Sequence, residues 1–181
     1  MSPPTFIPEY EAVEIITDEL KKAGLTFERK EKVIPGMMTK ERWVYWSHET
    51  KTKSFRDYGD ENPFYFELYN KELNMGIKYV TRSNYHKLGG PNETSTVQGY
   101  DLVEIVQEIR EKLREYNKTG KQINAVFFYD PMTSGDRNLF NLTGFGNPGK
   151  QSVSLLRKQV SAFAEWLKKE KTAGVLQNEK R

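Results

Sequence analysis

Hydrophobic residues recur at three- and four-residue steps in three separate stretches of the chain, as they do in helices with one buried face. The first stretch predicts a helix over residues 9–23. The second helix starts behind the capping-box pair Asp101 and Glu104, and its apolar stripe continues to Tyr116. The third stretch predicts a final amphipathic helix over about residues 151–170.

Five other segments have the residue types and spacing of β-strands. Residues 64–69 and 73–80 alternate apolar and polar positions and predict a hairpin with one buried face. Residues 25–34 and 42–48 are rich in β-formers, and the charged middle of the first is typical of an exposed or edge strand. Residues 123–129 are almost continuously apolar, which predicts a central strand covered on both faces.

The elements follow one another in the order α-β-β-β-β-α-β-α, which predicts a single α+β domain over residues 1–171. We expect a mainly antiparallel, twisted sheet of about five strands with three helices packed on it. The polar run 57–63 predicts a turn, and residues 83–99, which have no periodicity, predict a long loop. Residues 172–181 are polar and predict a frayed C-terminal tail.

Composition narrows the class of protein. The 181-residue chain is 13% aromatic, which argues for a folded core rather than disorder. It has no cysteine, so a disulfide framework, a thiolate metal site and a cysteine nucleophile are excluded. No apolar run approaches the roughly 18 residues that span a bilayer, and the first residues lack the layout of a signal peptide. These features predict a cytoplasmic protein without membrane contact, and the net charge of +3 permits a nucleic-acid partner without requiring one.

A glycine-rich segment comes close to two phosphate-binding patterns. Gly144, Gly146 and Gly149 match G-x-G-x-x-G, whereas the pattern G-x-x-x-x-G-K-[ST] is met through Lys150 and fails at Gln151. A phosphate loop works because backbone N–H groups at a helix start converge on phosphate and the lysine reaches its outer oxygens. No βαβ unit surrounds this segment, so we expect a turn and a helix start, with nucleotide or phosphate binding at residues 144–150 as an alternative.

Carboxylates near the predicted hairpin form a second candidate site. Asp60 lies in the acidic turn and Glu67 on the next strand, and such oxygen ligands suit Mg²⁺ or Mn²⁺. The helix-then-hairpins order over residues 9–129 resembles the core of the PD-(D/E)xK nucleases. That resemblance implies a metal-dependent phosphodiesterase with Asp60 and Glu67 as ligands, but position 69 is Tyr where the motif has Lys, and Lys78 would have to activate water instead. The other interpretation is a solvated strand face with a Glu67–Lys78 cross-strand pair.

Aromatic residues gather in one third of the chain. They are Trp43, Tyr45, Trp46, Phe55, Tyr58, Phe64, Tyr65, Phe66, Tyr69, Tyr79 and Tyr85. We expect Tyr65 and Tyr69 on the wetter face of the sheet, near the basic Arg56, while Tyr85 and His86 fall in the long loop. Interleaved rings and cations suit base stacking and phosphate contact, and equally a protein interface; the alternative is a second hydrophobic cluster under a helix.

The leading interpretation is a non-catalytic binding or accessory protein. Its contact surface would combine the aromatic sheet face with the segments 83–99 and 131–149, and its partner would be a protein or a nucleic acid. No cofactor and no metal site are expected on this interpretation. Mg²⁺ or Mn²⁺ would be required only by the phosphodiesterase alternative. The sequence does not specify an oligomeric state, nor does it decide whether the protein is an enzyme.

Overall fold

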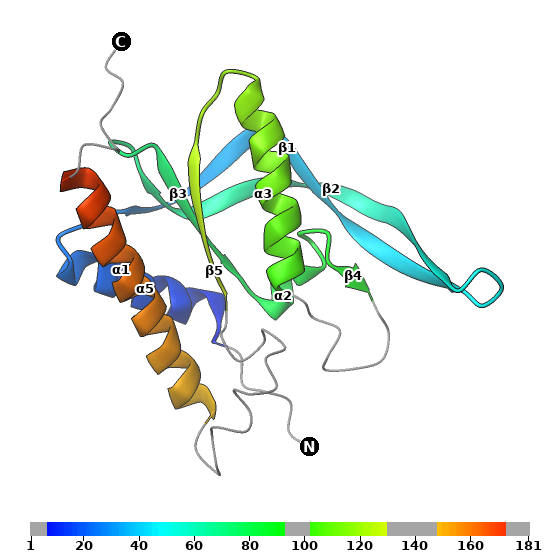
Figure 1. Ribbon diagram of the computed structural model, residues 1–181, viewed down its shortest axis with the longest axis horizontal. Coiled ribbons are helices and arrows are strands. Elements are labelled where there is room, and N and C mark those ends of the chain that lie inside the picture. The colour runs from blue at the N-terminus through cyan, green and yellow to red at the C-terminus, as the bar shows by residue number, and fades with distance from the viewer. Residues whose placement is uncertain (1–6, 93–101, 130–147, 173–181) are drawn as a thin grey trace.

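The computed structural model describes residues 7–92, 102–129 and 148–172 (Figure 1). The chain has an α+β fold with a five-stranded sheet in the order β4-β1-β2-β3-β5. The strands are β1 Glu28–Ser47, β2 Thr52–Asn70, β3 Met75–Val80, β4 Pro91–Asn92 and β5 Asn124–Tyr129. The helices are α1 Glu9–Lys22, α2 Arg82–Tyr85, α3 Leu102–Lys118 and α5 Pro148–Thr172.

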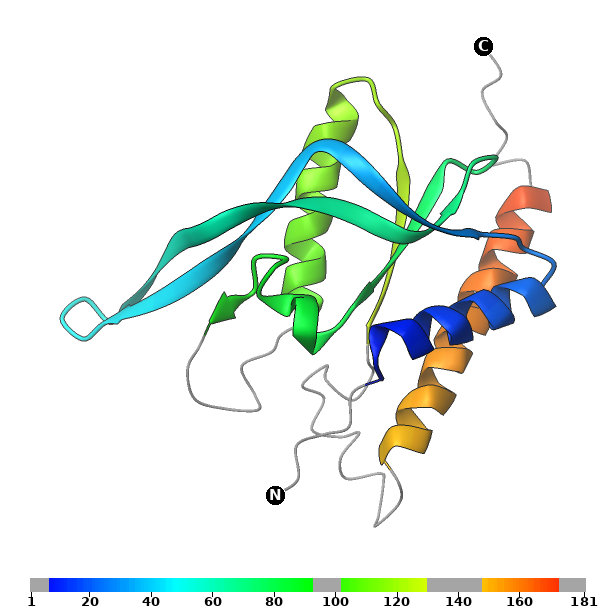
Figure 2. The same cartoon turned by 180° about the vertical axis from the view of Figure 1, so that it is seen from behind.

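Helices cover both faces of the sheet, and each face has its own hydrophobic core (Figure 1 and Figure 2). The first core joins α1 and α5 to the sheet and includes Ile16 and Val160. The second joins α3 to the opposite face and includes Ile109 and Phe66. The helical periodicity of the sequence therefore identified the buried faces, except at Tyr10, which fits the apolar stripe of α1 but is 63% exposed. No helix in the described part of the chain is long and apolar enough to cross a membrane.

Antiparallel pairing dominates the sheet, as expected, but both ends of the strand order are parallel. β1 and β2 pair antiparallel from Glu28–Tyr69 to Ser47–Thr52, and β2 pairs antiparallel with β3. β3 pairs in parallel with β5, and β1 in parallel with the two-residue β4. The predicted α+β class, with about five strands and three main helices, is confirmed.

Two expected interruptions are bulges inside long strands. Most of the segments 25–34 and 42–48 belongs to one continuous strand, β1, which runs from Glu28 to Ser47 and whose register with β2 shifts between Val33 and Met38. The run 57–63 is part of β2 rather than a turn, and the register shifts there too. Gly59 has a φ of +75°, a conformation that suits glycine, so turn-forming residues are accommodated within a strand.

Two further expectations need correction. β5 is covered on both faces, since Phe127 and Phe128 belong to opposite cores, but it lies at one end of the strand order and not in the centre. Within the segment 83–99, α2 and β4 are ordered elements, and residues 93–99 lie outside the described part of the chain. A continuously apolar strand therefore indicates that both faces of the strand are buried. It does not indicate the position of the strand in the strand order.

Candidate functional site

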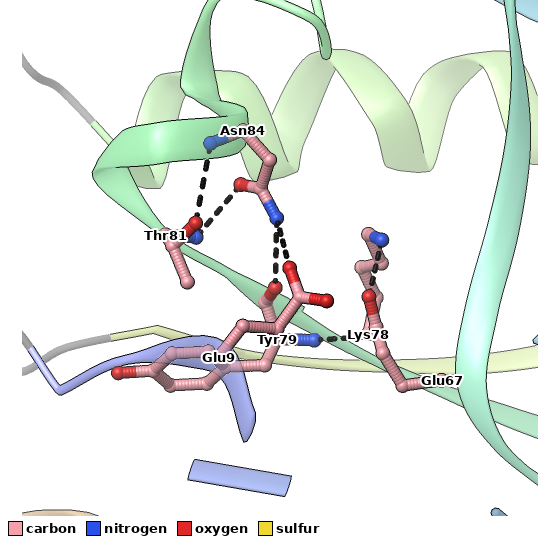
Figure 3. Close-up of polar contacts among 6 residues, drawn as sticks. All are labelled: Glu9, Glu67, Lys78, Tyr79, Thr81 and Asn84. Carbon is pink, nitrogen blue, oxygen red and sulfur yellow. Dashed lines mark hydrogen bonds and ion pairs between the residues drawn. The ribbon is translucent and has the colours of Figure 1, made fainter. Parts of the chain in front are cut away.

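β2 and β3 separate at Glu67, and the carboxylate of Glu67 stands between them (Figure 3). Close to their connecting turn the two strands pair by backbone, from Asn70–Met75 to Leu68–Ile77. Further along, the backbone N–H of Tyr79 donates to Glu67 Oε2 at 3.1 Å. A side chain thus satisfies a backbone donor of β3 where β2 turns away. We call this place the fork.

Lys78 completes the fork. Its ammonium group is ion-paired with Glu67 and lies 3.8 Å from the centre of the Tyr65 ring, close enough for a cation–π contact. Both members of the ion pair are almost fully buried: 2% of Lys78 and 7% of Glu67 is exposed. The expected cross-strand pair is present, but it is buried and not on a solvated face. A pair of this kind depends on its hydrogen bonds, because both charges have lost their hydration.

The electrostatics of the fork follow from this burial. Burial raises the pKa of the Glu67 carboxyl, although the Lys78 ammonium and the Tyr79 N–H act in the opposite direction. The pKa of Tyr65 is raised to about 12, first by burial and then by the negative charges of Glu9 and Glu67. Tyr65 therefore keeps its phenolic proton at neutral pH and cannot serve there as a base.

Helix α1 and the short helix α2 extend the polar network beyond the fork (Figure 3). The side-chain amide of Asn84 donates to Glu9 at 3.0 Å and to the backbone carbonyl of Tyr79 at 3.3 Å. Asn84 also forms a reciprocal cap with Thr81, which starts α2. Sequence reasoning missed Glu9, Thr81 and Asn84; the Thr-x-x-Asn spacing was the available signal for the cap.

The proposed metal-ligand set is not assembled. Asp60 is exposed and precedes Glu67 by seven residues in the same strand, which separates the two by roughly 20 Å at the rise of an extended chain. Within the described residues there is no group of three or more side chains of the kinds that ligate metals. The structure brings Glu67 and Lys78 together and leaves Asp60 elsewhere.

The distal half of the β1–β2 hairpin projects away from the helices (Figure 1 and Figure 2). We call residues 43–56 the arm. Within the described residues, the strand pairing of β4 with β1 ends at Trp43, and beyond it β1 and β2 pair only with each other. A hydrogen bond from the Thr50 N–H to Ser47 Oγ, at 3.2 Å, helps to close the turn at the tip. By its described backbone pairing, the arm is thus a two-stranded ribbon that joins the rest of the sheet at its base.

Arg42 ties the base of the arm to the body of the protein. Its guanidinium lies 3.1 Å from Asp57 on β2 and 3.1 Å from Glu108 on α3. Only 22% of the Arg42 side chain is exposed, so these contacts are partly shielded from solvent. One side chain therefore joins both strands of the ribbon to the helix that covers the sheet.

The residues predicted for a binding surface differ in their solvent exposure. Tyr85 is 1% exposed and belongs to the core, so its expected place on a binding surface is wrong. Tyr65 and Tyr69 are half-buried, and Tyr69 donates to Asn74 at 2.6 Å. His86 is half-buried with Nδ1 3.3 Å from a backbone carbonyl, whereas Arg56 is exposed in the arm. Of these five candidates only Arg56 is exposed.

The glycine-rich segment is described only in part. Gly144 and Gly146 lie outside the described residues. Gly149 and Lys150 fall in the first turn of α5, and Lys150 is exposed. The expected helix start is confirmed, and phosphate binding stays a prediction, because a helix N-terminus alone does not make a site.

Comparisons of this chain with models of protein families, with curated proteins and with solved structures find no significant match. The resemblance to PD-(D/E)xK nucleases is therefore one of element order only. The function has to be inferred from the fork, the arm and the charges around them.

Proposed function

We propose that this chain is a non-catalytic binding protein whose arm contacts a macromolecular partner. The observation that carries this proposal is the isolation of the arm. Of the side chains described between Met37 and Phe64, none belongs to either hydrophobic core. The arm nevertheless contains the aromatic residues Trp43, Tyr45, Trp46 and Phe55. Aromatic residues on a ribbon that projects from the body of the protein suit contact with a partner, where they are favoured anchors.

The support of the arm at its base favours the same function. Arg42 fixes the ribbon to α3, and the Lys40–Glu61 ion pair of 3.0 Å joins the two strands nearby. The fork gives β2 a defined point of departure from β3. A contact element held in one direction before binding loses less conformational entropy when its partner arrives.

Metal-dependent phosphodiester hydrolysis is the second candidate. One observation favours it: Glu9 lies near enough to the fork to raise the pKa values of both Glu67 and Tyr65, so two carboxylates and Lys78 share one region. We rank it second because the ammonium of Lys78 is already paired with Glu67, and because Asp60 is elsewhere. Without a displaced Lys78, no group at the fork is placed to activate a water molecule.

Site-specific photocrosslinking tests the leading proposal. A benzophenone amino acid would replace the exposed Ser54 in the arm, and in a matched variant it would replace Tyr10, which is 63% exposed on α1. We expect covalent adducts in the cells that naturally produce the chain from position 54 and not from position 10. Adducts from neither position, or from Tyr10 alone, would contradict the proposal.

A shortened arm provides the second test. Replacing residues 44–55 by Asn-Gly joins the paired residues Trp43 and Arg56 through a two-residue hairpin turn. Because the described side chains of the arm belong to neither core, the melting temperature should stay within a few degrees of the parent value. The partner captured at position 54 should no longer co-purify with the shortened chain, and unchanged co-purification would refute a role for the arm.

A further inference from the structure

We propose that the partner of the arm is a single strand of nucleic acid. This inference rests on the proposed binding function and names the chemical class of the partner. It follows from three properties of the arm: its charge, the register of its aromatic residues and its ribbon form.

The arm carries a net positive charge. Between residues 43 and 56 there are three Lys/Arg residues and one acidic residue, a net charge of +2. Lys51 and Arg56 are exposed. At the base, by contrast, Arg42 and Lys40 are paired with carboxylates. A partner that contacts the arm therefore meets the positive charges of Lys51 and Arg56, which favour a polyanion.

The strand register places two of the four aromatic positions of the arm opposite basic positions. Trp43 is paired with Arg56, and Trp46 is paired with Lys53. Single strands are bound by this combination, in which rings stack on bases and cations contact the phosphates that run alongside. A protein partner would gain from the rings but would be constrained to an acidic surface by the same cations.

A duplex fits the arm less well than a single strand. A two-stranded β-ribbon can enter a major groove, but there it meets base edges, because the base faces are already stacked. Four of the fourteen residues of the arm are aromatic, and rings recognise base faces that only an unpaired strand exposes. The high proportion of aromatic residues in the arm therefore favours a single strand over a duplex as its partner.

Fluorescence anisotropy with short oligonucleotides tests this inference directly. The probes are a labelled thymidine 20-mer, a labelled uridine 20-mer and a 20-base-pair DNA duplex. We expect tighter binding of both single strands than of the duplex, and the two single-stranded probes distinguish DNA from RNA as the source. With three cations on phosphates, the slope of log K against log salt should be about −2, a loss of about 15- to 20-fold between 50 and 200 mM.

Matched variants locate the binding surface. Reversing Lys51, Lys53 and Arg56 to Glu should abolish the salt-dependent binding. The same change of charge at three exposed lysines of α5, namely Lys158, Lys168 and Lys169, should leave it within about twofold. Trp46→Ala should weaken single-strand binding by about tenfold or more, and Trp46→Phe should restore most of it, because stacking needs a ring of any kind.

The outcomes separate this inference from the proposed function. No binding of any probe at 50 mM salt, duplex binding as tight as single-strand binding, or equal losses from the arm and α5 variants would each overturn the inference. If, in addition, nuclease leaves the mass of the adducts from position 54 unchanged, the arm binds a protein, and the proposed function stands without the inference. Adducts that shift on nuclease treatment support both.

Discussion

Substituting Lys78 by Met would test how the fork is held together. Methionine keeps an unbranched apolar stem beside Tyr65 and removes the ammonium that pairs with Glu67. Glu67 then retains the Tyr79 N–H as its described hydrogen-bond donor, in a position that is only 7% exposed. The variant therefore leaves a buried carboxylate without its counter-charge.

The expected decrease in the free energy of unfolding of Lys78→Met is large for a single substitution. Breaking a buried ion pair by removing one partner costs roughly 3–5 kcal/mol, because the remaining charge is uncompensated. For a chain of this length each kcal/mol lowers the melting temperature by about 2–4 °C, so a decrease of roughly 6–20 °C is expected. The double variant Glu67→Gln, Lys78→Met should recover most of the loss, since glutamine can accept from the Tyr79 N–H without a charge.

The stability loss of Lys78→Met should also depend on pH, and the raised pKa of Glu67 sets the direction of this dependence. Burial already raises that pKa above its usual 4.5, and removing Lys78 takes away the main influence that lowers it. Between pH 4.5 and the raised folded pKa, the unfolded chain has released this proton while the folded chain still holds it. The contribution of this carboxyl to stability is therefore full below pH 4.5 and is lost as the pH rises through its folded pKa.

Urea unfolding at pH 5 and at pH 8 would measure this dependence for the parent, the single variant and the double variant. We expect the free-energy loss of Lys78→Met to be clearly greater at pH 8 than at pH 5, and that of the double variant to be nearly independent of pH. Equal losses for the single variant at both pH values, within about 0.5 kcal/mol, would show that Glu67 is solvated and that the fork is not held by this pair.

Three other predictions concern the close packing, the arm and metal binding. Gly76→Ala should cost about 1–3 kcal/mol in urea unfolding, because the added Cβ would lie 2.3 Å from the ring of Phe66; a neutral result would show that the ring moves easily. Arg42→Ala should leave global stability within about 1 kcal/mol yet accelerate amide exchange in residues 43–56, and unchanged exchange would refute its role at the base. Mn²⁺ should not shift the melting temperature relative to chelator; a rise of about 5–10 °C that is abolished by Glu67→Gln would move the phosphodiesterase to first place.

The sequence patterns predicted the helices and strands well, but they did not predict which polar side chains are buried. The alternation in residues 64–69 and 73–80 located the β2–β3 hairpin and the pairing of Glu67 with Lys78, because strand register is a local property. The same alternation placed this pair in solvent. Its burial depends on the departure of β2 from β3 and on the Tyr65 ring, which two-residue periodicity does not encode.

Contacts between distant segments explain the remaining differences. Glu9 reaches the fork through Asn84, 75 residues away in sequence, so no local window could connect them. The run 57–63 has the composition of a turn, but its residues pair with β1 around a bulge at Gly59, and long-range pairing decided the structure. Tyr85 is buried for a related reason, because it belongs to the core that α3 forms with the sheet.

The fork and the arm should be energetically independent, although both lie on β2. Glu67 and Arg56 are eleven residues apart in an extended strand, and the two regions share no described side-chain partner. Effects at sites more than about 10 Å apart add to within about 0.5 kcal/mol. Lys78→Met should therefore cost the same in the full chain and in the chain with residues 44–55 replaced by Asn-Gly, as measured by urea unfolding at pH 8. A smaller cost in the shortened chain would show that the arm pulls β2 away from β3, and that the Glu67–Lys78 pair exists to resist that pull.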